Sequence, residues 1–160
     1  MKALTLTPEW AWAVCHLGKR VENRTWKPTA SMIGQTIALH AGKARPDWSA
    51  VDLMAGCAGW SVRTFDHGYR KPGISLRAPD RDALTRGAIV ATFRLVRTHA
   101  VAKANCVGWE CGPICWDIAD VQVLARPVPC KGALGMWTVP ADIAEQVCLS
   151  PSLRDGVLRG

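Results

Sequence analysis

The first residues of the chain change from a two-residue to a helical pattern of apolar positions. Leu4 and Leu6 alternate with threonines, which is typical of a short strand with one buried face. Residues 7–9 read Thr-Pro-Glu, which favours a helix start, because threonine caps a helix, proline fits its first position and an acid suits its first turn. The pattern predicts a helix from there to Leu17, and Gly18 ends it.

Later apolar segments predict a mixed domain. Strands are expected over residues 21–26, 34–41, 87–97 and 116–124, and helices over residues 46–54 and 140–147. Residues 128–137 follow Pro127 and contain Pro129, Gly132 and Gly135, which predicts a kinked segment near a sheet edge. Five or six strands at irregular spacing predict an α+β fold, in which a small closed or half-closed β-barrel carries helices at its mouth.

Length and composition indicate one domain over residues 1–160. Hydrophobic residues make up 49% of the chain, enough for a sizeable core. Residues 56–86 are rich in Gly, Arg and Asp, which predicts a long insertion with one helix near 80–84, of the kind that often serves as a lid or binding loop. The chain has no stretch of 18 apolar residues and no signal peptide at its start, so a cytoplasmic protein without membrane contact is expected.

The positive charge is concentrated in one part of the chain. The net charge is +7, and residues 1–100 hold 15 Lys and Arg against 7 Asp and Glu. Residues 101–160 hold 5 against 6. This asymmetry suggests an anionic partner such as RNA or a nucleotide, and a surface tuned for solubility explains it equally well.

The seven cysteines give little support for a metal site. No CxxC pair occurs, and the closest set is Cys106, Cys111 and Cys115, with His99 upstream. Structural zinc favours ligands paired at turn-like spacing, which this set lacks. The cysteines are therefore interpreted as small buried hydrophobic residues, and neither a metal nor a cofactor is expected.

The run over residues 17–26 is polar, yet it lies between the predicted helix and a buried strand. Such a run tends to line a cleft, which makes Lys19 and Glu22 candidate catalytic residues. Burial among apolar walls would disfavour the charged amine of Lys19, which could then take a proton from water or attack a carbonyl. Positions i and i+3 of a strand point to opposite faces, so contact with Glu22 requires a bend. The alternative is a salt bridge that closes the barrel mouth.

Several neighbours are candidate substrate-binding residues. Arg24 has a fork suited to a phosphate, a carboxylate or a base edge, and pairing with a carboxylate such as Glu22 is the competing role. Asn23 could read a pyrimidine edge or form a turn. Core packing is the competing role for any tryptophan, and a structural hydrogen bond is the competing role for a histidine at a strand end. The remaining candidates are three tryptophans that could stack on a base, together with a histidine and a lysine at a strand end: Trp10, Trp26, Trp116, His40 and Lys43.

Several of these segments, in this order, resemble the ASCH domain, a family with a PUA-like β-barrel. The stretch GKRVENRTW at residues 18–26 is similar to the family signature, in which a lysine is followed by Glu-Asn-Arg and an aromatic residue. VPCKGALGMW at residues 128–137 is similar to the ending of bacterial and phage members. Weaker similarities lie at residues 8–11, 39–43 and 87–91, and the insertion at 56–86 is not covered.

The resemblance implies a pocket at the barrel mouth, built by residues 18–26 and 40–43. Family members are RNA-binding modules, ribonucleases or small amidohydrolases that remove acyl groups from the exocyclic amine of cytidine. The hydrolytic members carry threonine where Glu22 stands, so Glu22 would replace that residue and Glu110 would supply the remaining acid. We therefore expect an amidohydrolase acting on N4-acylcytosine or N4-acylcytidine. The alternatives are an RNA or modified-nucleotide binding module and, less favoured, a ribonuclease.

Overall fold

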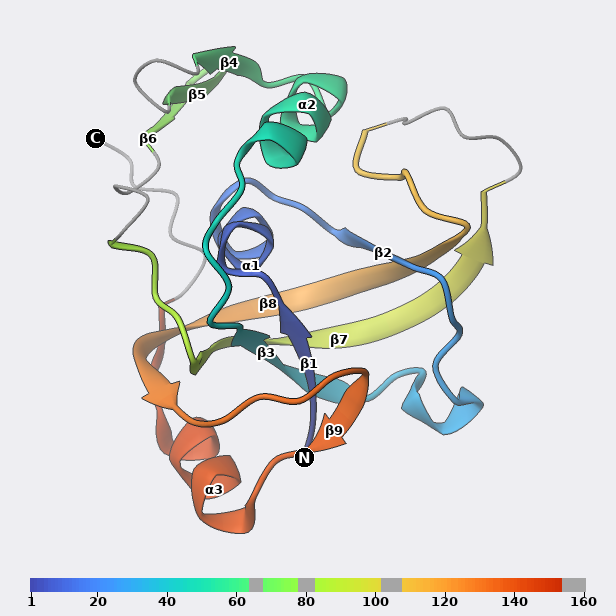
Figure 1. The fold of residues 1–160 in the computed structure, drawn as a ribbon, viewed down its shortest axis with the longest axis vertical. Helices are drawn as coiled ribbons and strands as arrows, with labels where there is room; N and C mark the ends of the chain where they lie inside the picture. The colour runs from blue at the N-terminus through green and yellow to red at the C-terminus, as the bar shows by residue number, and fades with distance from the viewer. Residues whose placement is uncertain (64–67, 78–82, 102–107, 154–160) are drawn as a thin grey trace.

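The computed structural model describes residues 1–63, 68–77, 83–101 and 108–153, and its main feature is a strongly curled sheet (Figure 1). The strands of this sheet are β1 (Lys2–Leu6), β2 (Val21–Arg24), β3 (Thr36–Ala41), β7 (Ala88–Ala100), β8 (Ile114–Pro129), β9 (Met136–Thr138) and β10 (Ser152–Leu153). Their order is β10-β8-β7-β3-β1-β9, and β2 pairs with the first part of β8. The helices are α1 (Pro8–His16), α2 (Ser49–Cys57) and α3 (Ala141–Leu149), with a 3₁₀ turn η1 (Ala30–Met32).

The curl comes mainly from the long antiparallel pair β7 and β8. Their register shifts between Ile89 and Ala91 and at two further places, and each such irregularity increases local twist. Asp120 has a φ of 51°, a left-handed conformation, within β8. The sheet therefore wraps around its own concave face, which confirms the predicted α+β fold with a half-closed barrel.

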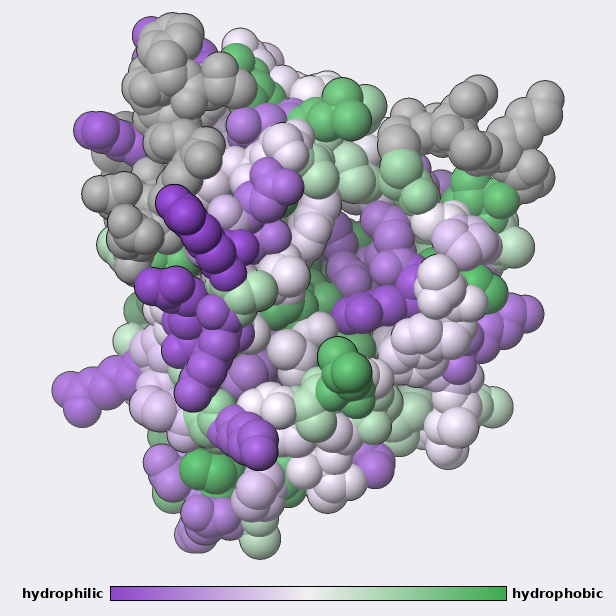
Figure 2. All heavy atoms as spheres, in the orientation of Figure 1, coloured by the Kyte–Doolittle hydropathy of each residue, from purple (hydrophilic) through white to green (hydrophobic). Residues whose placement is uncertain are grey.

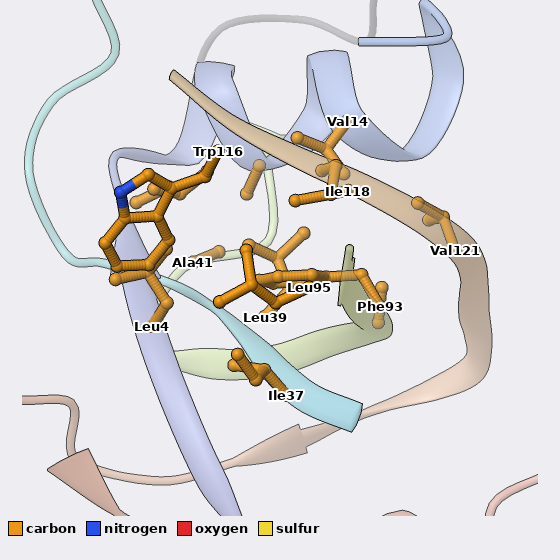
Figure 3. Close-up of a cluster of buried hydrophobic side chains, with 13 residues drawn as sticks. Leu4, Val14, Ile37, Leu39, Ala41, Phe93, Leu95, Trp116, Ile118 and Val121 are labelled. Carbon is orange, nitrogen blue, oxygen red and sulfur yellow. The ribbon is translucent and has the colours of Figure 1, made fainter. Parts of the chain in front are cut away.

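The concave face holds the first hydrophobic cluster (Figure 3). Alternate residues of each strand point inward, as the Leu4 and Leu6 pattern predicted. Helix α1 closes one side of this cluster with Ala11 and Val14. The labelled side chains are Leu4, Val14, Ile37, Leu39, Ala41, Phe93, Leu95, Trp116, Ile118 and Val121.

The predicted insertion contains a second, small sheet that the sequence pattern did not reveal. Its strands are β4 (Ser61–Arg63), β5 (Gly68–Lys71) and β6 (Ile74–Arg77), in that order. With α2 they cover the outer side of α1 through a second cluster around Trp48 and Tyr69. The strands have three or four residues each, too short for a clear alternation of apolar positions. The helix expected near 80–84 falls mostly outside the described residues.

A third cluster lies on the convex face, beneath α3. Ala3 and Ala38 point to this side, opposite to their neighbours in the first cluster, and Val147 of α3 packs with them. The segment predicted as kinked forms the end of β8 and, after an irregular stretch, the edge strand β9, which pairs with β1. No helix in the described part of the chain is long and apolar enough to cross a membrane.

Candidate functional site

Lys19 lies in the turn that joins α1 to β2. Helix α1 ends at His16, and Gly18 follows with a φ of 67°, in the left-handed region that favours glycine. The backbone amide of Lys19 donates to the carbonyl of Ala13, so the chain folds back against the helix. Lys19 is consequently buried, with 1% of the residue's surface exposed.

Lys19 and Glu22 form a buried ion pair. Lys19 Nζ lies 2.6 Å from Glu22 Oε2 and donates a second hydrogen bond, of 2.5 Å, to the carbonyl oxygen of Val21. The expected conflict between positions i and i+3 does not arise, because Lys19 precedes the strand and approaches Glu22 from the turn. The ring of Trp10 adds a further contact, with its centre 5.4 Å from Lys19 Nζ.

Arg24 completes a cluster of three charges on the concave side of β2. Its Nε lies 3.1 Å from Glu22 Oε1, and its guanidinium also donates to the carbonyl oxygen of Thr5. Two cations therefore flank one carboxylate, which leaves the cluster with a net positive charge. Figure 2 shows hydrophilic side chains gathered in a hollow over β2. Such a cluster can hold an anion or stabilise developing negative charge on an oxygen atom.

Glu9 is a buried acid that the sequence analysis did not select. It is 4% exposed, Thr7 donates a hydrogen bond to one of its carboxylate oxygens, and Oε2 has no hydrogen-bond partner among the described residues. It lies one helical turn before Ala13, whose carbonyl holds Lys19, so it shares that face of α1. The signal in the sequence was ambiguous, because an acid in the first turn of a helix is usually an exposed contribution to the helix dipole.

The predicted stacking tryptophans lie in different places: Trp10 lies beside the charged cluster, and Trp116 lies in the hydrophobic core. Trp116 is fully buried in the first hydrophobic cluster, so it cannot stack on a base. Its indole N–H donates to the carbonyl oxygen of Trp26, and the two rings meet edge to face with centres 4.7 Å apart. Of the three predicted stacking residues, only Trp10 contacts the charged cluster.

Asn23 has a structural role in place of the predicted base reading. Its side-chain amide donates to the carbonyl of Trp109, and its oxygen accepts from the backbone amide of Cys111. The thiol of Cys115 lies 3.4 Å from the same oxygen. These contacts hold β2 against the segment that precedes β8. Successive strand residues point to opposite faces, so Asn23 points to the convex side of the sheet while Glu22 points to the concave side.

Glu110 does not join Lys19 and Glu22. It lies 3.4 Å from His99 Nε2, and His99 is paired with Cys115 in the β7–β8 register. Cys115 is paired in turn with Asn23, one position away from Glu22. Since side chains of successive strand residues point to opposite faces, the assignment of Glu110 to the catalytic acid is corrected: it belongs to a cluster on the convex side.

His40 and Lys43 line a separate pocket of about 670 Å³ on the convex side of β1 and β3. His40 Nε2 lies 3.1 Å from the carbonyl oxygen of Cys130, and the imidazole meets the ring of Trp137. Burial lowers the pKa of His40 below its usual value, with a further small lowering from Lys43. A side chain at Gly132 would clash with the imidazole, so the absence of a Cβ there keeps the pocket in shape.

The sequence matches no protein-family model and no curated protein. The fold is similar to that of a solved structure, "ASCH from Zymomonas mobilis", with a TM-score of 0.53 and 12% identity over 94% of this chain and 95% of that one. A point mutant of the same protein aligns with a TM-score of 0.52 and 12% identity, covering 94% and 98%. The chain therefore has the ASCH fold, as its sequence motifs predicted.

Proposed function

We propose that the protein is a small amidohydrolase that removes acyl groups from the exocyclic amine of cytosine or cytidine. The observation that carries the proposal is the buried contact between Lys19 and Glu22, with Arg24 on the other carboxylate oxygen. The ASCH fold supports it, because the sequence resembles the hydrolytic members of that family at the lysine. The substrate is a neutral pyrimidine base or nucleoside. Its hydrolysis by this cluster needs no metal ion.

The hydrolysis requires a base for water and positive charge for the oxygen of the amide. Glu22 accepts a proton as water attacks the carbonyl carbon, since each of its oxygens has a lone pair beyond those used by Lys19 and Arg24. The carbonyl oxygen becomes an oxyanion, which the two cations stabilise. Glu22 then returns the proton to the departing nitrogen as the carbon–nitrogen bond breaks, giving a carboxylic acid and the free exocyclic amine.

This division of roles differs in one respect from the sequence-based hypothesis, in which Lys19 is the base or nucleophile. The amine of Lys19 already donates to two acceptors at 2.5 and 2.6 Å, an arrangement suited to an ammonium group. Lys19 therefore acts by its charge, and Glu22 handles the proton. A Lys19→Arg variant separates the two roles, because arginine keeps the charge and cannot act as a base.

The deciding experiment is a spectrophotometric assay of N4-acetylcytidine hydrolysis. The native protein should release cytidine. The control variant Lys27→Ala removes an exposed lysine and should release cytidine at the same rate. Lys19→Ala should lose turnover by at least about 100-fold, the loss expected for a group that assists proton transfer or charge stabilisation. Circular dichroism of each variant shows whether it is folded. Undiminished turnover by folded Lys19→Ala, or no turnover by the native protein, would contradict the proposal.

The alternative function is a module that binds RNA or a modified nucleotide without catalysis. Its support is the pocket of His40, which two lysines line, Lys43 and Lys131. Phosphate contacts make affinity fall steeply as salt concentration rises, whereas hydrolysis of an uncharged nucleoside should depend little on salt. Binding of a short RNA with a steep salt dependence, together with an absence of turnover, would favour this function.

A further inference from the structure

On the convex side of the sheet, three potential metal ligands of different chemistry converge. His99 of β7, Glu110 of the segment before β8, and Cys115 of β8 each place one ligand atom within 4.8 Å of the others. None of them belongs to the Lys19 cluster, which lies on the concave side. We propose that His99, Glu110 and Cys115 form a binding site for a divalent thiophilic cation, with Zn²⁺ as the best match.

The geometry is close to that of a bound zinc ion. Zinc lies about 2.0–2.3 Å from nitrogen, oxygen and sulfur ligands, so tetrahedral ligands are separated by roughly 3.3–3.8 Å. The Nε2 atom of His99 and Oε1 of Glu110 are already 3.4 Å apart. Moving the sulfur of Cys115 by about 1 Å or less would complete the three-ligand face, and the fourth position would hold water.

A second carboxylate, that of Asp117, lies beside the other ring nitrogen of His99. Asp117 Oδ1 lies 3.5 Å from His99 Nδ1, the ring nitrogen that faces away from Glu110. Nδ1 is buried and has no hydrogen-bond partner that meets ordinary geometry among the described residues. When Nε2 binds a metal, Nδ1 carries the proton and donates to a nearby carboxylate, and this arrangement orients most metal-binding histidines. Asp117 is in place for that role, while its other oxygen is held by Arg97.

The charges also favour a cation. Glu110 and the thiolate form of Cys115 contribute two negative charges, which a divalent ion neutralises, and Arg97 balances Asp117. A metal ion would therefore displace the thiol proton on binding.

Cobalt(II) titration followed by absorbance tests the proposal on the purified full chain. A thiolate bound to Co²⁺ gives a charge-transfer band in the near ultraviolet, and we expect it to saturate at one ion per chain. Cys115→Ser should abolish the band, and Cys148→Ser, which removes an exposed free thiol of α3, should leave it unchanged. Competition with Zn²⁺ should remove the band, because zinc binds such sites more tightly than cobalt.

Three further variants test the site independently, in case Cys115→Ser fails to fold. Two of them change proposed ligands and one changes a positioning residue. His99→Gln and Glu110→Gln change side chains that are only partly buried, and each should weaken Co²⁺ binding by more than about 100-fold. Asp117→Asn should weaken it by about 10- to 100-fold with the band still present at saturation. The absence of a charge-transfer band in the native protein would overturn the proposal. So would a band of unchanged affinity in His99→Gln and Glu110→Gln.

Discussion

Two polar clusters lie back to back across one strand, and adjacent residues of that strand belong to different ones. Glu22 points to the concave side and meets Lys19, whereas Asn23 points to the convex side and meets Cys115. The first of these polar clusters is largely buried and places two cations around one carboxylate. The second is partly exposed and combines a histidine, a thiol and carboxylates. A two-residue alternation thus allows one short strand to serve two different chemistries.

The largest expected difference between the clusters is in catalysis. Glu22→Gln keeps the shape of the side chain and removes its basicity, so hydrolysis of N4-acetylcytidine should fall by about 10²- to 10⁴-fold. The matched change Glu110→Gln on the convex side should leave kcat and KM unchanged. Steady-state kinetics of the two variants measures this difference directly. A large loss of kcat in Glu110→Gln with normal rates in Glu22→Gln would reverse the assignment of the two clusters.

The sequence predicted the order of the principal elements and the proximity of Lys19 and Glu22, because both depend on local signals. The helix start at Thr7-Pro8-Glu9, the glycine stop at Gly18 and the polar run around Lys19 are features that neighbouring residues determine. The contact between Lys19 and Glu22 was expected to need a bend, and the turn before β2 provides it.

Residues that depend on strand pairing were harder to place. Glu110 was assigned to Lys19 because nothing in the linear sequence tells which face of a neighbouring strand it joins. Trp116 was a candidate for stacking on a ligand, with core packing as the competing role, and its register opposite Glu22 turns it into the core. The small sheet β4-β5-β6 was missed for the same reason, since its short strands are defined by their partners and not by a pattern of their own.

The next largest difference should be in stability. Replacing Lys19 by Met keeps most of its volume but leaves Glu22 buried beside a neutral group, which should lower the free energy of unfolding by about 3 kcal/mol. Arg97→Met removes the partner of Asp117 from an exposed ion pair and should cost less than about 1 kcal/mol. Urea denaturation followed by tryptophan fluorescence compares the two variants. Equal losses would mean that the Lys19 contact is no more protected from water than the surface pair.

Asn23 links the strand to the convex cluster, so its loss should have an intermediate effect. Asn23→Ala removes the hydrogen bonds that Asn23 makes with the carbonyl of Trp109 and the backbone amide of Cys111, which should cost about 1–3 kcal/mol in unfolding free energy. Binding of Co²⁺ should weaken, because Cys115 loses a neighbour that positions it. KM for N4-acetylcytidine should stay within about twofold, as it should for Thr25→Ala, a change at an exposed neighbour. A large rise in KM in Asn23→Ala alone would restore the hypothesis that this residue reads the base.

The smallest expected effect is a pH dependence of stability from His40, which lies outside both clusters on β2. Burial holds the pKa of His40 below the 6.5 of an unperturbed histidine, so the unfolded chain takes up this proton at a higher pH than the folded protein does. The stabilising contribution of the neutral imidazole is therefore fully present above pH 6.5 and declines as pH falls from there toward the folded pKa. Urea denaturation at pH 7.5, 6.5 and 5.5 should show a shallower decline in His40→Gln than in the native protein. The same slope in His40→Gln and the native protein would mean that His40 titrates alike in both states, and the pocket around Gly132 would then be open to water.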